Sequence, residues 1–240
     1  MAGDRSLHLS YASNREYELW TIYYGDDPEV FKNYQQSSDR AWRSKGLKIE
    51  LVRKILLHQL FFNEGFNFQQ YDFIFLPDDD IKFPNNEKDI DDLFKICRQL
   101  EADVFQPALL NGERTPPWKS TKLVPDAFCH RTNIVEVMMH GFSGKAFADA
   151  FLPAIHAMQF MRSGWGIEPI WMKIGEVRFC RSLRTFVIDA IPAIHTKPLG
   201  SGSPEIHEIG MLEARYVPQI QMNRMKTIAV YKDISQVTWP

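Results

Sequence analysis

The chain is poor in cysteine, and its cysteines do not form the patterns that disulfide scaffolds or structural zinc sites require. Its 240 residues include Cys97, Cys129 and Cys180, an odd number with no C-x-x-C spacing. Both kinds of site need closely spaced or paired cysteines. The pattern fits a reducing compartment, so we expect a cytoplasmic location.

Long apolar runs are also missing. Residues 1–14 are polar and lack an apolar centre, so no signal peptide is expected. Among the longest apolar tracts, 147–161 is interrupted by Pro153 and His156, and a membrane-spanning helix needs roughly 20 apolar residues. We therefore expect no transmembrane segment, while peripheral attachment at the inner face of a membrane stays open.

No charge of one sign dominates. Lysine and arginine number 28, aspartate and glutamate 30, and the formal net charge is −2. No positive field is available to attract nucleic acid, so a nucleic-acid partner is not expected. Because no repeat or low-complexity linker is visible, we expect one domain over 1–240. It would carry an N-terminal extension (1–16) and a flexible loop with a C-terminal tail (201–240).

Strand-like and helix-like segments alternate along the chain, which predicts an α/β fold with a mixed, mostly parallel central sheet flanked by helices. The expected strands cover 18–24, 71–77, 103–107, 133–139 and 185–194. The expected helices cover 48–62, 86–100 and 144–161, with another beginning near Glu168 or Pro169. Ligands of such sheets bind beyond the carboxyl ends of the strands. Asp26, Asp78–Asp80 and His195 all fall at such ends and are expected to converge.

Three consecutive carboxylates, Asp78, Asp79 and Asp80, directly follow the apolar segment 71–77. In an extended chain Asp78 and Asp80 would project to the same side. Oxygen ligands open to solvent suit Mg²⁺ or Mn²⁺ carrying a phosphorylated substrate. A solvated turn, a helix cap and a phosphoryl-transfer aspartate are the alternative interpretations. A calcium loop lacks support because the glycine and late glutamate of an EF-hand are missing.

His195 ends the strand-like segment 185–194 and is followed by Lys197. A neutral imidazole can complete a metal site that a carboxylate begins, although a lone histidine in this position is commonly a packing residue. Lys197 can meet a phosphate as a point charge. The polar residues 201–204 suggest a lid, a hypothesis from composition alone.

Candidate acceptor-binding and nucleotide-binding residues come from three other segments. Trp165 and Gly166 would offer an apolar platform for a sugar ring. Glu168 is either a general base or a plain acid at a helix start. Glu136 lies within an apolar segment, where it must be hydrogen-bonded in the core or face a pocket. Tyr23 and Asp26 would contact a base or ribose, although Tyr23 could equally belong to the core.

Four phrases together resemble a family of glycosyltransferase-like proteins known as domain of unknown function seven hundred and seven, which is similar to the GT-A class of nucleotide-sugar transferases. They are Tyr71–Ile81, Asn133–Met138, Ser163–Glu168 and Val187–Pro198, in the same order and spacing. The resemblance covers about 19–200. It implies a Rossmann-like GT-A fold and a divalent metal, usually Mn²⁺, that bridges the donor diphosphate.

The resemblance also implies roles for individual residues. Asp78 resembles the ribose-side acid of the Asp-x-Asp motif, and Asp80 resembles its metal ligand. His195 resembles the late metal-binding histidine, and Glu168 resembles the catalytic base of inverting members, where an aspartate is more usual. Tyr23 and Asp26 resemble first-strand nucleotide contacts.

From these observations we expect transfer of a sugar from a nucleoside diphosphate sugar to a hydroxyl acceptor, such as a glycan or a lipid-linked glycan. The expected donor-side residues include Asp79 and Lys197, and the expected metal ligands are Asp78, Asp80 and His195. Two alternatives stay open. One is a metal-dependent phosphoryl-transfer enzyme, and the other is a catalytically silent glycan-binding protein of the same fold.

Overall fold

The computed structural model describes residues 15–62, 67–110, 119–197, 204–216 and 226–237. The expected lid residues 201–203 and most of the expected N-terminal extension lie outside this part of the chain. The strands are β1 (Trp20–Tyr23), β2 (Arg40–Arg43), β3 (Phe73–Pro77), β4 (Ile81–Lys82), β5 (Val104–Leu109), β6 (Cys129–Thr132), β7 (Met139–Ser143), β8 (Thr185–His195) and β9 (Thr227–Tyr231).

Helices cover much of the remaining described chain. They are α1 (Pro28–Ser37), α2 (Lys48–Phe62), α3 (Glu87–Gln99), α4 (Gly144–Ala146), the π-helical η4 (Phe147–Phe151), α5 (Leu152–Ala157), α6 (Glu168–Phe179) and α7 (Pro204–Tyr216). Short 3-10 turns are η2 (Phe68–Gln70), η3 (Lys119–Thr121) and η6 (Ile234–Gln236). No helix of the described residues has the length and apolar character needed to cross a membrane.

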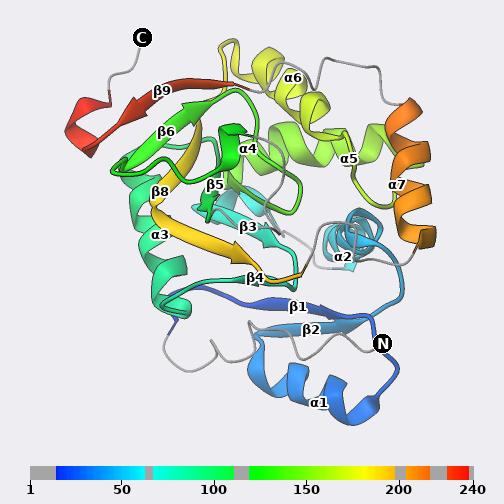
Figure 1. The fold of residues 1–240 in the computed structure, drawn as a ribbon. Helices are drawn as coiled ribbons and strands as arrows, with labels where there is room; N and C mark the ends of the chain where they lie inside the picture. Colours follow the sequence, from blue (N-terminus) through cyan, green and yellow to red (C-terminus); the bar gives the residue numbers. More distant parts are fainter. Residues whose placement is uncertain (1–14, 63–66, 111–118, 198–203, 217–225, 238–240) are drawn as a thin grey trace.

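The described strands other than β1 and β2 form a seven-stranded sheet in the order β3-β7-β5-β8-β6-β9, with β4 paired to β8 (Figure 1). Only β5 and β8 pair in parallel within it. The pairs β3–β7, β5–β7, β6–β8, β6–β9 and β4–β8 are all antiparallel. The α/β class and the mixed sheet are therefore confirmed, but the expectation of a mostly parallel sheet is wrong. No two strands that follow one another in the chain are neighbours in this order, so the antiparallel pairs join segments far apart in the sequence.

The first strand lies apart from this sheet. β1 pairs in parallel with β2, and α1 crosses between them, so 20–43 forms a small unit beside the main sheet (Figure 1). The helix begins at Asp27, whose carboxylate accepts hydrogen bonds from the backbone amides of Glu29 and Val30, and Pro28 occupies its first turn. An aspartate cap followed by proline is a strong helix start.

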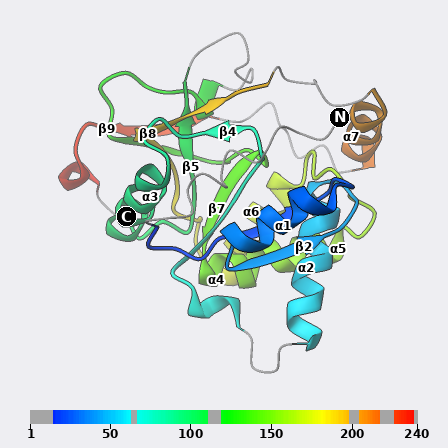
Figure 2. The same ribbon diagram turned by 90° about the horizontal axis from the view of Figure 1, so that it is seen from below.

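Alternation along the strands divides the buried side chains between the two faces of the sheet. In β5, Val104 joins the cluster of α2, η4, α5 and α6, whereas its neighbour Phe105 joins the cluster of α3. Figure 2 shows α3 on one side of β5 and β7, with α2 and α5 on the other. Since side chains of a strand alternate between faces, the helices cover both sides of the sheet, as the sequence predicts.

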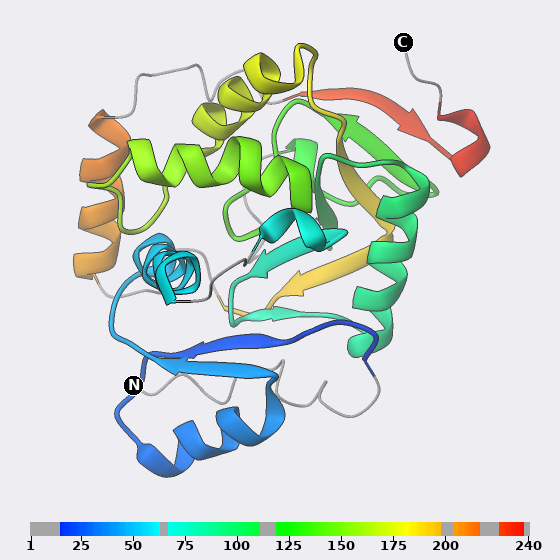
Figure 3. The same cartoon turned by 180° about the vertical axis from the view of Figure 1, so that it is seen from behind.

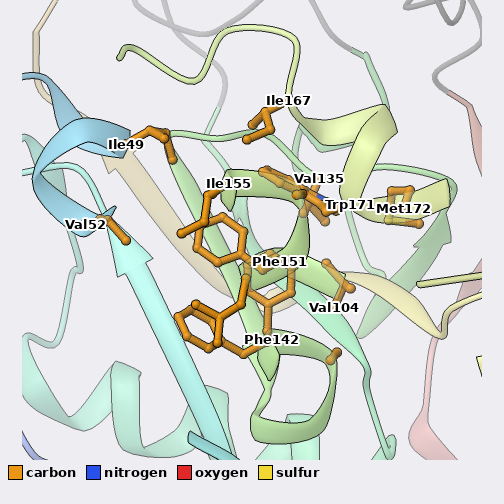
Figure 4. Close-up of a cluster of buried hydrophobic side chains, with 14 of the residues drawn as sticks. Ile49, Val52, Val104, Val135, Phe142, Phe151, Ile155, Ile167, Trp171 and Met172 are labelled. Atoms are coloured by element: carbon orange, nitrogen blue, oxygen red, sulfur yellow. The ribbon is translucent and has the colours of Figure 1, made fainter. Parts of the chain in front are cut away.

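The larger core is strongly aromatic. Phe142 of β7, Phe151 of η4 and Trp171 of α6 are fully buried and contact one another, with ring centroids 4.9–5.5 Å apart (Figure 4). On the other face, Gly141 of β7 lies directly against Phe105. A Cβ atom there would stand 2.3 Å from the ring. Glycine is therefore required where the phenylalanine crosses the neighbouring strand.

Two predicted elements differ from the structure. The segment 133–138 is not a strand; it is an irregular connection between β6 and β7. Ile134 and Val135 are buried in the larger core, so their apolar character reflects packing rather than strand pairing. The range 201–240, expected as a flexible loop and tail, contains α7 and β9, and β9 extends the main sheet beside β6 (Figure 3).

Candidate functional site

The three aspartates form a turn between β3 and β4. The amide of Asp78 donates to the Met138 carbonyl at 2.8 Å, and both the amide and the hydroxyl of Thr196 donate to the Asp80 carbonyl at 2.9 Å. β4 then pairs antiparallel with the end of β8, where Ile81 lies opposite His195. The turn is thus fixed between the 136–138 connection and the end of β8.

Asp80 and His195 are the two candidate metal ligands that the fold brings together. Nε2 of His195 lies 3.5 Å from Oδ2 of Asp80, and their side chains are only 9% and 13% exposed. The buried atoms Asp80 Oδ1 and His195 Nδ1 have no hydrogen-bond partner among the described residues. Burial raises the pKa of Asp80; His195 opposes this rise, while Asp78 and Asp79 add to it. Buried acceptor atoms left unpaired are costly, so this pair is suited to a bound cation.

Asp78 and Asp79 have other partners. Asp78 Oδ1 lies 2.7 Å from Nζ of Lys48. Asp79 Oδ2 accepts a 2.7 Å hydrogen bond from the Tyr24 hydroxyl and lies 3.7 Å from Nζ of Lys197. The expectation that Asp78 and Asp80 project together from an extended segment is therefore wrong, because the chain turns at these residues. Burial, and then the hydrogen bond to Asp79, raises the pKa of Tyr24.

The residues that are present fit a divalent cation only in combination with a substrate. In the described ranges no group of three or more Asp, Glu, His or Cys side chains is arranged to hold a metal. The facing atoms Asp80 Oδ2 and His195 Nε2 offer one oxygen and one nitrogen, and Asp80 Oδ1 is a buried acceptor without a partner among the described residues. Mg²⁺ and Mn²⁺ commonly take one or two protein ligands and fill their other positions with phosphate oxygens and water. Asp78 is the weaker candidate because Lys48 already neutralises it.

Two buried carboxyl groups, those of Glu136 and Glu168, lie at the 136–138 connection. Glu168, the first residue of α6, is 6% exposed, and its Oε1 accepts a 3.2 Å hydrogen bond from the Val137 amide. Its Oε2 has no hydrogen-bond partner within the described chain. Burial raises the pKa of Glu168 to about 7, against the lowering effect of backbone amides. Glu168 is therefore close to half ionised near neutral pH, as a general base requires.

Glu136 is the second buried carboxyl group. It is 4% exposed and accepts a 2.7 Å hydrogen bond from the Thr121 hydroxyl, and its amide donates to Oε1 of Gln106 at 2.7 Å. Burial raises the pKa of Glu136 to about 8, and the neighbouring Glu168 contributes to the rise. Of its two expected alternatives, hydrogen bonding within the core is the one that these contacts describe.

The described contacts of the first-strand candidates Tyr23 and Asp26 are with residues outside the aspartate turn. The ring of Tyr23 is buried against Phe31 and Tyr34, and its hydroxyl accepts a hydrogen bond from the Asp27 amide. Asp26 is 81% exposed and pairs with Lys45, which lowers its pKa. Tyr24, which directly follows β1, donates its hydroxyl to Asp79, so the end of β1 lies beside the aspartate turn. The described contacts of Asp26 are with Lys45 and Arg43, and its convergence with the other carboxylates stays a prediction.

The turn before α6 is covered by α7. The face of the Trp165 indole packs on Gly210 of α7, where a Cβ would lie 2.7 Å from the ring. Glu213 of α7 is buried and accepts hydrogen bonds from the amides of Arg162 and Ser163 and from the Ser163 hydroxyl, at 2.6–3.0 Å. Gly166 has a φ of +86°, which favours glycine. The indole face next to Gly210 is thus occupied by protein. Less of the Trp165 ring is therefore left as a platform for a sugar ring than the sequence suggests.

A surface cleft of about 350 Å³ lies at the opposite end of the sheet, beside the first residues of β3, β5 and β8. Its charged side chains pair with one another, as Arg98 does with Asp72 and Arg181 with Asp103. No residue of the aspartate turn lines it. The candidate site is therefore the region between β3, β8 and α6.

The sequence analysis did not identify Lys48 as a site residue, and it did not foresee the hydrogen bond from Tyr24 to Asp79. Nζ of Lys48 joins Asp78 to the carbonyls of Val137 and Met138, at 2.6–3.2 Å. The feature that could have drawn attention to Lys48 is its place at the first position of a helix, where the helix dipole disfavours positive charge. Comparison with known proteins adds no assignment: no protein-family model matches the chain, and no curated protein matches it significantly.

Proposed function

We propose that the protein is a metal-dependent glycosyltransferase that moves a sugar from a nucleoside diphosphate sugar to a hydroxyl acceptor with inversion. The observation that carries this proposal is the Asp80–His195 pair, with unsatisfied buried atoms on both side chains. The buried Glu168, whose pKa burial raises to about 7, supplies a base in the same region. The resemblance to GT-A enzymes supports the same arrangement.

The donor side is formed by the aspartate turn. Asp80 and His195 would hold Mn²⁺ or Mg²⁺, which supplies a Lewis acid that neutralises the diphosphate. Lys197 stands beside Asp79 and can contact a phosphate oxygen. Asp78, which pairs with Lys48, can accept from a ribose hydroxyl, and the exposed Tyr24 ring provides a surface for the base.

We assign the acceptor side to Glu168, with Trp165 and Gly166 in the turn before it. Glu168 would take the proton of the acceptor hydroxyl through its unpaired Oε2 as the oxygen attacks the anomeric carbon. Its raised pKa makes it a stronger base than an exposed glutamate, while it remains substantially ionised above pH 7.

A thermal-shift panel tests the proposal. Nucleoside diphosphates and nucleotide sugars are each added with Mn²⁺ and with chelator, because a ligand that binds the native state raises Tm. We expect one nucleotide family to stabilise the protein only when Mn²⁺ is present. Transfer from the matching nucleotide sugar to candidate hydroxyl acceptors is then measured by release of nucleoside diphosphate.

Two outcomes would replace the proposal. Stabilisation by a nucleotide, with release of inorganic phosphate and no need for a sugar, would indicate a metal-dependent phosphoryl-transfer enzyme. Failure of every nucleotide to stabilise the protein, combined with metal-independent binding to a glycan array, would indicate a silent glycan-binding protein.

A further inference from the structure

Lys48 has a set of contacts that its position on α2 does not explain. A lysine in the first turn of a helix faces the positive end of the helix dipole and loses stability there. Its side chain is nevertheless only 20% exposed. The contacts it makes must therefore offset both the dipole and the partial loss of hydration.

Those contacts use the whole hydrogen-bonding capacity of the ammonium group. Nζ lies 2.6 Å from the Val137 carbonyl, 3.2 Å from the Met138 carbonyl and 2.7 Å from Oδ1 of Asp78. An ammonium group has three N–H donors and no acceptor. With three acceptors already in place, Lys48 has no donor left to bind a phosphate directly.

The three acceptors belong to the two halves of the proposed site. Asp78 begins the aspartate turn, and its amide also donates to the Met138 carbonyl at 2.8 Å. On the other half, the amide of Val137 donates to Oε1 of Glu168. Val137 thus accepts from Lys48 through its carbonyl and donates to Glu168 through its amide. The chain of contacts Asp78–Lys48–Val137–Glu168 is continuous.

The charge of Lys48 acts on the same residues. It lowers the pKa of Glu168, opposing the larger effect of burial. Burial lowers the pKa of His140, and Lys48 adds to this effect; the imidazole is fully buried and its Nδ1 contacts the Val137 carbonyl at 2.7 Å. The charged and titratable groups that face this connection are therefore Asp78, Glu136, His140 and Glu168.

We propose that Lys48 is the positioning residue that holds the donor-side Asp78 and the acceptor-side Glu168 in one fixed arrangement through the 137–138 carbonyls. This inference rests on the proposed glycosyl transfer for its kinetic consequence, but the coupling itself concerns only residues of the chain. Lys48 contacts neither donor nor acceptor in this scheme. It fixes the distance between Asp78, which would contact the donor, and Glu168, which would contact the acceptor. Misplacement of such groups by about 1 Å can reduce turnover about 100-fold.

The test compares Lys48→Met, Lys48→Arg and the matched control Lys54→Met. Lys54 lies on the same helix, is 47% exposed and pairs with Glu50. The first readout uses ¹³C-labelled glutamate and follows the carboxyl resonance assigned to Glu168 with Glu168→Gln. We expect Lys48→Met to move its midpoint to higher pH, and Lys48→Arg and Lys54→Met to leave it near the wild-type position.

The second readout is the kinetics of folded protein. We expect Lys48→Met to lower kcat by about 100-fold and to raise KM for the donor, with part of kcat restored by Lys48→Arg. Both constants are measured on protein that circular dichroism shows to be folded. A purely structural role for Lys48 would lower the fraction of active enzyme, and with it the apparent kcat, without changing KM for the donor.

The outcomes separate the two proposals. If wild-type protein transfers no sugar but the Glu168 midpoint moves in Lys48→Met, the proposed function fails and the coupling stands. If wild-type protein is active while Lys48→Met keeps the wild-type midpoint, kcat and KM, the positioning role is overturned. Should Lys48→Met not fold, Lys48→Gln, which retains hydrogen-bond donors without the charge, takes its place in both readouts.

Discussion

Oδ2 of Asp80 and Nε2 of His195 lie 3.5 Å apart, although the two residues are separated by most of the main sheet in sequence. The antiparallel pairing of β4 with the end of β8 produces this contact, because Ile81 lies opposite His195. The turn that carries the carboxylate is therefore held by backbone pairing as well as by the side chains of Thr196, Lys48 and Tyr24. A ligand pair fixed in this way loses little conformational entropy when a cation binds.

The first prediction concerns metal binding. Asp80→Asn and His195→Gln should each weaken Mn²⁺ binding in the presence of the stabilising nucleotide by more than about ten-fold, since each removes a direct ligand. Loss of the free Mn²⁺ signal in electron paramagnetic resonance titrations measures the affinity. Asp72→Asn, at a 70% exposed surface pair, is the control and should bind as wild type. If both site variants bound Mn²⁺ with unchanged affinity, Asp80 and His195 would not be the metal ligands.

The second prediction concerns the pH dependence of turnover. Burial raises the pKa of Glu168 to about 7, and a general base acts in its ionised form. The rate should therefore rise with pH through about 7 and level off above it. Glu168→Gln should lower kcat and remove this limb of the profile, while donor binding measured by thermal shift is kept. Glu176→Gln is the matched control on the same helix, at a side chain that is 40% exposed, and it should retain the profile. If Glu168→Gln instead lost donor binding, Glu168 would be a structural residue.

The third prediction concerns stability at alkaline pH. The pKa of Glu136 is raised by burial to about 8, above the value near 4.5 of an unperturbed glutamate. The folded state therefore holds a proton that the unfolded state has released, and stability falls as pH rises from about 4.5 through about 8. Urea unfolding at several pH values should show a shallower decline for Glu136→Gln, whose Oε1 can still accept from Thr121. A decline as steep as that of wild type would contradict the buried, protonated Glu136.

The fourth prediction concerns the end of α5. The guanidinium of Arg53 donates to the carbonyls of Ile155, Met158, Gln159 and Met161, at 2.8–3.2 Å. Hydrogen bonds to a charged group are worth roughly 1.5–3 kcal/mol, so Arg53→Met should lower the free energy of unfolding by about 3 kcal/mol. Lys54→Met, its exposed neighbour, should lower it by less than about 1 kcal/mol. Chemical denaturation gives both values, and equal losses would exclude a special role for Arg53.

Regular periodicity made much of the fold predictable. The ranges 48–62 and 86–100 were expected as helices and correspond to α2 and α3, because apolar residues recur along one face of each. The strand ending at His195 was likewise expected. These segments carry their structural signal within a few turns or alternations, so local sequence is sufficient to find them.

Other features depend on partners far along the chain. The apolar residues of 133–138 suggested a strand, but they pack into the core as an irregular segment. β6 and β9 are short and acquire their identity from pairing with each other. Strand direction is likewise a tertiary property, which explains why a mostly parallel sheet was predicted and a mostly antiparallel one is present.

The candidate site was predictable where residue type and strand end coincided, as at Asp80 and His195. It was not predictable where a contact depends on how separate units pack. Asp26 was expected at the site because it follows a strand, yet that strand belongs to the small β1–β2 unit. Lys48 was not expected because its importance lies in two backbone carbonyls, which sequence composition does not reveal.

The pairing of β6 with β9 has a consequence for synthesis of the protein. β6 lies between β8 and β9 in the sheet, but β9 is translated long after both β6 and β8. Until residues 227–231 have been synthesised, the edge of β6 that pairs with β9 has no partner. Open strand edges are where chains associate wrongly. A premature stop before Thr227 would leave that edge exposed permanently, and the truncated product would aggregate even though every residue of the candidate site had been made.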